Sequence, residues 1–513
     1  MAWLSMQTRY DSVPPYSRRL GPVAALCLLT LAGGLVPIGC SRRSPSPAGS
    51  QALRIGTQNT PEALNVFSTM LTAEPLLGVD SHGRATPRLA SKWQWLNNGR
   101  ALSISLRPDV QFHDGSPVTA AAVAAILRKN IPTDGAQGFR YLTSIETPNA
   151  LSLTFHLSQP DAFLVEAIAG ALILDETRPN VRTGPFKIVS SDPVLVAEKN
   201  IAYYRGAPGI AKVEVTFFDT QRAVFAAMMR GSLDMVPEVN PESVEFLEGA
   251  SQFETFPSVR PFYIPLVFNV RHPILKNVDV RRAIVQAIDR EEIVRQAMRG
   301  HARTAEDPIW PSHWAYSGAV KGYAYDPAAA RARLDAAGFP VRPARPDTMA
   351  SRFQLNCLFY NKDFQFERIA MLLQRQLEDV GVDLVLTGVD PRTLTTRAKT
   401  GDFDSYVFQL RSGTSFDWTY RFWHSDGGFQ STGYSGANAV LDDLRRSYND
   451  ADVRIAMVNL RQRFHEDVPA AFLAWPETTR AVDAGFDIGD KSEPEVFSNL
   501  WRWHAGPDQK VQR

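Results

Sequence analysis

Apolar residues recur with two different periods along most of the chain. Residues 102–106 and 151–157 alternate large apolar side chains with small or polar ones, which is the period of a half-buried β-strand. Between these segments, Thr119 precedes the run AAAVAAILRKN, and a threonine in that position is typical of a helix N-cap. The pattern therefore predicts a strand, a capped helix and a second strand in succession.

A second block repeats this order. KVEVTFFD (212–219) predicts a strand and Thr220 predicts the cap of the following helix. QRAVFAAMMR (221–230) has the helical period, and Gly231 marks the helix end. LDMV (233–236) then predicts another strand.

The later half continues the alternation. VRRAIVQAIDREEIVRQAM (280–298) predicts one long amphipathic helix, and Asp326-Pro327 opens a helix that closes at Gly338. FERIAMLLQRQLEDVG (366–381) predicts a helix that leads into the buried strand VDLVLTGVD (382–390). The fold class is therefore α/β, with mixed β-sheets flanked by helices, and a helical bundle or a β-sandwich is disfavoured.

The N-terminal segment has the layout of an export signal. Arg9, Arg18 and Arg19 precede an apolar run, residues 20–38, that glycines and prolines interrupt. A run of this length could also span a bilayer as an uncleaved anchor, but its late glycines and proline favour a signal peptide over residues 1–39.

The signal ends in a cysteine that resembles a lipidation site. The residues before and including Cys40 resemble the bacterial lipobox, with Pro37 where leucine is usual, and a plain secretory signal is the alternative. Residues 40–50 are polar and proline-rich, and such a composition predicts a flexible tether. Cys40 is therefore the expected lipid attachment point, which would place the protein on the periplasmic or cell-surface side of the cytoplasmic membrane.

Composition narrows the functional classes. The chain has 55 basic and 54 acidic residues, with no basic stripe interleaved with aromatics, so nucleic acid is not an expected partner. Of the three cysteines, only Cys357 lies in the body after the tether, in an apolar run that predicts a buried, inert thiol.

One region carries a family resemblance. Residues 89–127 (LASKWQWLNNGRALSISLRPDVQFHDGSPVTAAAVAAIL) resemble the signature region of the family 5 extracellular solute-binding proteins, the peptide, dipeptide and nickel binders of ABC importers. The positions in register are Trp93, Leu106, Arg107, Phe112, His113, Asp114, Gly115, Pro117, Thr119 and Ala120. Further matching segments in the expected order are 182–189, 200–218, 228–235, 268–294, 325–339 and 401–408.

No arrangement of residues predicts catalysis. There is no nucleophile elbow, phosphate loop or HExxH motif, so we expect no enzyme activity and no cofactor. His113 is interpreted as a structural histidine, because no second ligand lies nearby at metal spacing. Asp402 and Asp404 flank a strand and are expected to face solvent, and the scattered histidines disfavour a bare metal ion as ligand.

The resemblance implies a two-lobed periplasmic-binding-protein fold of type II, with an extra subdomain and the ligand cleft between the lobes. Lobe 1 is expected at 51–80, 185–262 and 476–513, the inserted subdomain at 81–184, and lobe 2 at 263–475. Chain crossings between the lobes are expected near 260–269 and 474–478. Closure of the cleft would exclude water and offer a permease a changed docking face.

The expected ligand site lies after the strand of GDFDSYVF. In peptide-binding members an aspartate there pairs with the peptide's α-amino group, and Gly413 occupies that position in this chain. Asp417 is the alternative acid, and Arg411 either recognises an anion or is a surface charge. The aromatic residues of the segment either line the pocket wall or form core beneath it.

Together, the candidate ligand-binding residues are Arg411, Asp417, Trp418, Trp423, Tyr263, Asn269, Asn59 and Thr60. The resemblance predicts a lipid-anchored, monomeric solute-binding protein that delivers a peptide-like solute to ABC permease subunits. The alternatives are a non-peptide ligand such as an opine, a sugar or a metal chelate, or a ligand-sensing receptor; an exported hydrolase is disfavoured because no nucleophile with a base is found.

Overall fold

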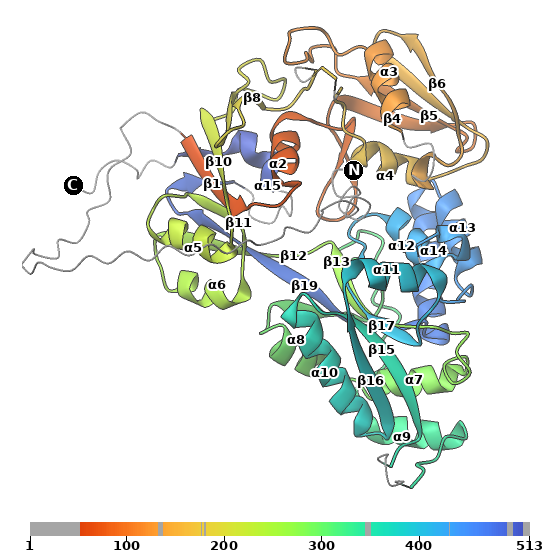
Figure 1. The fold of residues 1–513 in the computed structure, drawn as a ribbon. Helices are drawn as coiled ribbons and strands as arrows, with labels where there is room; N and C mark the ends of the chain where they lie inside the picture. The colour runs from red at the N-terminus through yellow and green to blue at the C-terminus, as the bar shows by residue number, and fades with distance from the viewer. Residues whose placement is uncertain are drawn as a thin grey trace, which may run out of the picture.

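The computed structural model describes residues 52–131, 137–175, 177–178, 181–343, 350–429, 431–489 and 496–505. They form two lobes joined by one large sheet, with a smaller β-sheet subdomain beside both (Figure 1). The predicted signal segment and Cys40 lie outside these residues. Within them, no helix has the length and apolar character that crossing a membrane requires.

The large sheet has the order β16-β15-β17-β13-β19-β11-β1-β10-β9-β8. Its first-lobe strands are β1 (Ala52–Gln58), β8 (Phe186–Ser190), β9 (Leu195–Lys199), β10 (Lys212–Phe218) and β11 (Met235–Val239). Its second-lobe strands are β13 (Phe262–Phe268), β15 (Phe353–Tyr360), β16 (Val382–Val389) and β17 (Ser405–Val407). The short strands β14 (Ala302–Thr304) and β18 (Leu410–Arg411) pair with β19 and β13 respectively.

One long strand, β19 (Ala470–Asp483), connects the two halves of this sheet (Figure 1). Its residues 470–474 pair with β13 of the second lobe. Its residues 477–483 pair with β12 (Phe253–Val259), which leads back to β13 through Arg260 and Pro261. The chain thus passes between the two sheet halves once from β12 to β13 and once within β19.

Helices pack beside the first-lobe strands. They are α2 (Ala63–Thr72), α5 (Gln221–Met229), α6 (Pro241–Glu248) and α15 (Val496–Asn499), and α5 is the one among them that the sequence predicts. The Thr220 side chain accepts a hydrogen bond from Ala223 N at 3.2 Å, which confirms the predicted cap of α5. Gly231 follows with a positive φ of 73°, a conformation that glycine adopts without strain.

The second lobe contains most of the helices. They are α7 (Val278–Gln286), α8 (Arg290–Ala297), α9 (Pro327–Ala336), α10 (Phe364–Glu378), α11 (Pro391–Thr400), α12 (Phe416–Trp423), α13 (Asn438–Arg446) and α14 (Asp450–Asp467). The prediction of one long helix over 280–298 is wrong, because the segment forms α7 and α8. Asp289 separates them, since its carboxylate accepts a hydrogen bond from Glu292 N at 2.9 Å and so begins a new helix.

The subdomain is built on the sheet β4-β5-β7-β6. Its elements are β4 (Ala90–Leu96), β5 (Ala101–Leu106), β6 (Leu142–Asn149), β7 (Ser152–Leu157), α3 (Ala120–Asn130) and α4 (Phe163–Gly170). Thr119 caps α3, as predicted, and apolar side chains of the sheet and both helices form a separate core. Two small two-stranded sheets complete the fold: β2 (Leu77–Val79) pairs with β3 (Ala85–Pro87), and β20 (Phe486–Asp487) pairs with β21 (His504–Ala505).

The structure tests three smaller interpretations. His113 is structural, because its ring nitrogen Nε2 lies 2.9 Å from the Gly184 carbonyl oxygen and burial lowers its pKa to about 4. Cys357 is fully buried in β15, and burial raises the pKa of its thiol to about 12. Asp402 is largely exposed, whereas Asp404 is partly buried and accepts a hydrogen bond from Asn356 N.

Candidate functional site

Helix α12 is the centre of the predicted ligand region. It follows β18, whose Arg411 pairs with Phe262 at the start of β13, directly after the passage between the sheet halves. Because β18 is anchored on β13, the residues from Arg411 to the first turn of α12 lie at the end of the second lobe that adjoins the first. The subdomain contacts this region through α4, as the hydrogen bonds below show (Figure 1).

Arg411, Trp418 and Asp417, which the sequence predicts as ligand residues, lie together. The Arg411 guanidinium carbon lies 4.9 Å from the centroid of the Trp418 ring, and that of Arg421 lies 5.2 Å from it. Both contacts are cation–π interactions on one partly exposed indole. The arrangement presents positive charge and an aromatic surface side by side.

Asp417 has one paired and one unpaired carboxylate oxygen. Its Oδ2 accepts a hydrogen bond from Arg421 Nε at 2.9 Å. Its Oδ1 is buried and accepts no hydrogen bond from any of the described residues. Burial raises the pKa of this carboxyl, while Arg421, Arg445 and Arg411 oppose the shift. An unpaired buried oxygen is costly, so the site favours a donor at this point.

Gly413 lies at the position where the family resemblance leads us to expect an aspartate, and the backbone conformation there favours glycine. Its φ is +75°, in the left-handed region. A Cβ atom at this position would lie 2.9 Å from Pro261 Cβ, closer than normal contact. The loop therefore has no room for an aspartate side chain at this position in its present conformation.

Replacing Gly413 with aspartate is expected to lower the free energy of unfolding by about 1–3 kcal/mol, because a left-handed non-glycine backbone and the Pro261 contact both add strain. Urea denaturation of both proteins would measure the difference. Gly170→Asp is a suitable control, because nothing lies within 4 Å of the Cβ that it would add. Equal stability of Gly413→Asp and the unchanged protein would contradict the steric argument.

Two aromatic candidates lie in the second-lobe core. Tyr263 is fully buried and its hydroxyl accepts a hydrogen bond from Trp423 Nε1 at 2.9 Å. Trp423 is 2% exposed and packs edge-on against Phe464 and Phe472. Trp423 also borders a small pocket, described below, whereas Tyr263 has the environment of a core residue.

The remaining candidates are apart from α12. The Asn269 side-chain amide donates to the carbonyl oxygens of Gly401 and Phe403, and its oxygen accepts from Arg271 N, so it holds a loop in place. Asn59 and Thr60 are exposed at the end of β1. The hydrogen-bond partners of the Asn269 side chain are thus Gly401, Phe403 and Arg271, and Asn59 and Thr60 follow β1 of the first lobe rather than β18.

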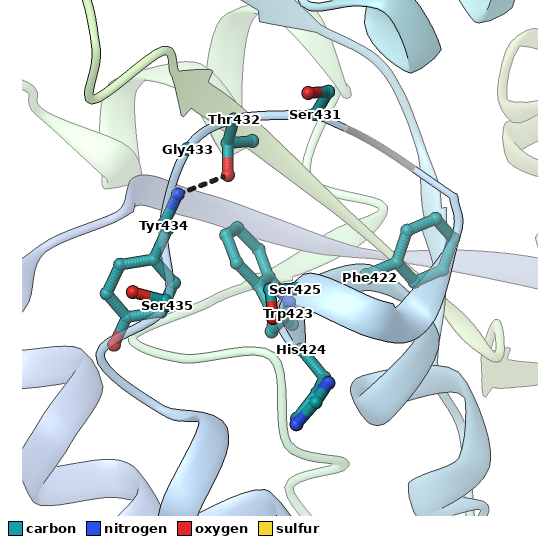
Figure 2. Close-up of a pocket in the computed structure, with 9 residues that line it drawn as sticks. All are labelled: Phe422, Trp423, His424, Ser425, Ser431, Thr432, Gly433, Tyr434 and Ser435. Atoms are coloured by element: carbon teal, nitrogen blue, oxygen red, sulfur yellow. Dashed lines mark hydrogen bonds between the residues drawn. The ribbon is translucent and has the colours of Figure 1, made fainter.

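A pocket of about 150 Å³ lies at the C-terminal end of α12 (Figure 2). Its lining is Phe422, Trp423, His424, Ser425, Ser431, Thr432, Gly433, Tyr434 and Ser435. The Thr432 hydroxyl oxygen accepts a hydrogen bond from Tyr434 N at 3.1 Å, which holds the loop across the pocket (Figure 2). Sequence reasoning missed its serines and Thr432, because isolated hydroxyl residues in a loop give no periodic signal.

Glu166 is a further residue that sequence reasoning missed. From α4 of the subdomain, its carboxylate accepts hydrogen bonds from Ser415 Oγ at 2.7 Å and from Phe416 N and Asp417 N, each at 3.1 Å. Burial raises the pKa of this carboxyl to about 7. Within the described residues, no group of three or more histidine, cysteine or acidic side chains is placed to hold a metal ion.

Comparison with known proteins agrees with this architecture. The Probable D,D-dipeptide-binding periplasmic protein DdpA of Escherichia coli is 26% identical over 339 residues, which cover 62% of this chain and 63% of that protein. The chain thus aligns with slightly less than two thirds of that relative's length.

Two solved structures share the fold. NikZ from Campylobacter jejuni, in complex with Ni(L-His), superposes with a TM-score of 0.72 at 20% identity, covering 89% of this chain and 99% of that one. AgaA from A. tumefaciens R10, in complex with agropinic acid, gives a TM-score of 0.69 at 21% identity, covering 88% and 98%. Both confirm the predicted two-lobed periplasmic-binding-protein fold.

The family model of the bacterial extracellular solute-binding proteins, family 5 Middle, matches residues 84–432, more than half of the 513-residue chain. The match includes the signature region, the subdomain and α12. The chain therefore belongs to the family 5 bacterial extracellular solute-binding proteins.

Proposed function

We propose that this solute-binding protein captures a short peptide-like solute beside α12, in the cleft between the lobes, and delivers it to the permease of an ABC importer. Membership of family 5 supports the transport role. The D,D-dipeptide-binding relative supports a ligand of peptide-like chemistry. The segment boundaries predicted from the resemblance, with lobe 1 in three pieces, belong to the same proposal.

The observation that carries the ligand class is the unpaired Asp417 Oδ1. A ligand ammonium group would supply the missing hydrogen-bond donor and a compensating charge. Arg411 and the Trp418 ring lie beside this acid, so a carboxylate or a flat side chain of the same ligand has a partner within the same region. A small zwitterion with an organic side chain fits these three groups.

Asp417→Asn is expected to weaken binding of L-alanyl-L-alanine by roughly tenfold or more, because a charge-assisted hydrogen bond is lost. Isothermal titration of the body from Ser50 onward would measure this. Asp402→Asn is the matched control, since the Asp402 side chain is 70% exposed. N-acetylation of the dipeptide should weaken binding to the unchanged protein similarly. Equal affinity of Asp417→Asn and the unchanged protein would remove Asp417 from the site.

A second candidate is a non-peptide solute, and the Gly413 loop favours it. This position lacks the acid that recognises a peptide α-amino group, and its geometry leaves no room for one. A thermal-shift panel with L-alanyl-L-alanine, agropinic acid and Ni(L-His) distinguishes the candidates. Ligand at a hundred times its dissociation constant stabilises by about 2.7 kcal/mol. A rise in melting temperature with agropinic acid or Ni(L-His), and none with L-alanyl-L-alanine, would replace the peptide-like ligand with a non-peptide one.

We also infer that Cys40 carries a lipid that holds the protein at the membrane surface. The basic, apolar and lipobox-like segments before it support this. Labelling of cells with a clickable fatty acid should tag the unchanged protein and leave Cys40→Ser untagged. Equal labelling of both would contradict the anchor, and release of a soluble, unlabelled protein would favour a plain secretory signal.

A further inference from the structure

We propose that Glu166 is a positioning residue for the solute site: from the subdomain, it caps the helix of the second lobe that carries Asp417 and Trp418. The three hydrogen bonds that Glu166 accepts all come from the first residues of α12 or its N-cap. One of them comes from the backbone N–H of Asp417 itself. The effect of Glu166 on ligand affinity rests on the proposed function, whereas the capping of α12 by Glu166 rests on the hydrogen bonds alone.

The local chemistry of α12 shows why an outside cap is needed. A helix begins with backbone N–H groups that have no partner within the helix, and an N-cap serine commonly accepts a hydrogen bond from one of them. Ser415 makes no such bond to α12 in the described structure. Its hydroxyl instead donates to Glu166 Oε2 at 2.7 Å. Glu166 thus replaces the missing cap and orients the serine at the same time.

An acid suits this position for electrostatic reasons. The N-terminus of a helix carries partial positive charge, which stabilises a nearby carboxylate. Hydrogen bonds to a carboxylate are also stronger than those between neutral groups. A negative charge on Glu166 is disfavoured by the nearby carboxyls of Asp161 and Asp417. Arg445 lies beside Asp161 and supplies a positive charge there. The hydrogen bonds from α12 offset this repulsion, so the Glu166 carboxylate and the first turn of the helix stabilise each other.

Neighbouring contacts tie the same two elements together. Ala162 N, just before α4, donates to the Arg445 carbonyl oxygen of α13 at 2.7 Å. The Arg445 guanidinium carbon lies 4.0 Å from the Tyr420 ring centroid and 4.9 Å from that of Phe163. Phe163, at the start of α4, packs within the aromatic core of the second lobe. The start of α4 is thus held in register with α12, which gives the Glu166 cap a fixed geometry.

This arrangement couples the subdomain to the solute site. If the subdomain separates from the second lobe, α12 loses its cap and the Asp417 amide loses its acceptor. A solute that binds Asp417 better in the capped state therefore also stabilises the contact between subdomain and second lobe. Glu166 therefore influences the affinity from the subdomain, whereas the residues that would touch the solute lie on the second lobe.

Residue-resolved hydrogen–deuterium exchange of the ligand-free protein tests the cap. Glu166→Gln keeps one acceptor, so exchange of the Phe416 or the Asp417 amide should be roughly tenfold faster, and Glu166→Ala should affect both. Glu291→Gln is the control, because Glu291 is an exposed acid in the first turn of α8. Unchanged exchange in α12, or an equal increase throughout the protein, would overturn the proposal.

A second arm tests the consequence for binding. Titration with L-alanyl-L-alanine should show a several-fold weaker affinity for Glu166→Gln, with Glu291→Gln unchanged. Ser415→Ala removes one of the same hydrogen bonds, so the double variant Glu166→Gln/Ser415→Ala should lose less than the sum of the two single changes. If the dipeptide does not bind at all, the proposed function fails while the exchange result still decides the cap. Unchanged affinity with faster exchange would overturn the positioning role.

Discussion

Replacement of Arg461 by methionine is expected to lower the free energy of unfolding by about 3–5 kcal/mol, the largest loss that we predict. Arg461 Nε donates to Asp307 Oδ2 at 2.6 Å, and the two side chains are only 2% and 7% exposed. Arg461 Nη2 also donates to Tyr316 Oη and to the Val320 carbonyl oxygen, each at 2.9 Å. Methionine would fill part of the volume but would leave the Asp307 carboxylate buried without its counter-charge.

Urea denaturation of matched variants would measure this loss. Arg463, on the same helix, is the control, because it pairs with Glu466 and its side chain is 43% exposed. Arg463→Met should change the free energy of unfolding by no more than about 1 kcal/mol. The double variant Arg461→Met/Asp307→Asn should recover part of the loss, because the unpaired charge is gone. A loss in Arg461→Met as small as that in the Arg463 control would contradict the importance of the buried pair.

Arg445→Met is expected to cause a similar loss, about 3 kcal/mol or more, at the contact between subdomain and second lobe. Arg445 Nε lies 3.8 Å from Asp161 Oδ1, and the two side chains are 2% and 0% exposed. Burial raises the pKa of Asp161 to about 7, and Arg445 opposes this shift. Without Arg445 the pKa of Asp161 would rise further, because a buried carboxylate would then lack its nearest positive charge.

The sign of the pH dependence follows from this raised pKa. An acid whose pKa is higher in the folded than in the unfolded state destabilises the fold as pH rises through the two values. Removing Arg445 increases that difference, so the loss in Arg445→Met should be larger at pH 8 than at pH 5. Arg446→Met, at a 55% exposed side chain, is the control and should show little loss at either pH. A loss independent of pH would contradict the electrostatic explanation.

Local sequence signals predicted the α/β class and several individual strands and helices of the fold. Thr119 and Thr220 cap helices as expected, because capping depends on residues only three positions apart. The helix predicted over 280–298 failed for the same kind of local reason. Its apolar period continues through the break, so the period alone does not show that Asp289 begins a second helix. The aspartate at position 289, a residue type that favours helix N-caps, was the sequence signal that could have indicated the start of a second helix.

The candidate site was predicted only where its residues are close in sequence. Arg411, Asp417 and Trp418 belong to one short segment, and the structure places them together. Tyr263 and Trp423 are equally aromatic but lie in the core, and composition does not distinguish a pocket wall from a core. Glu166 could not be found in this way, because about 250 residues separate it from its partners and only the tertiary fold brings them together.

The buried thiol of Cys357 has a practical consequence for measuring lobe movement. Thiolate is the species that reacts with maleimides, and Cys357 combines full burial with a pKa of about 12. It is also the only cysteine in the sequence after residue 40. Probes attached to two engineered surface cysteines, one on each lobe of the body from Ser50 onward, would therefore report distance without first removing the native thiol.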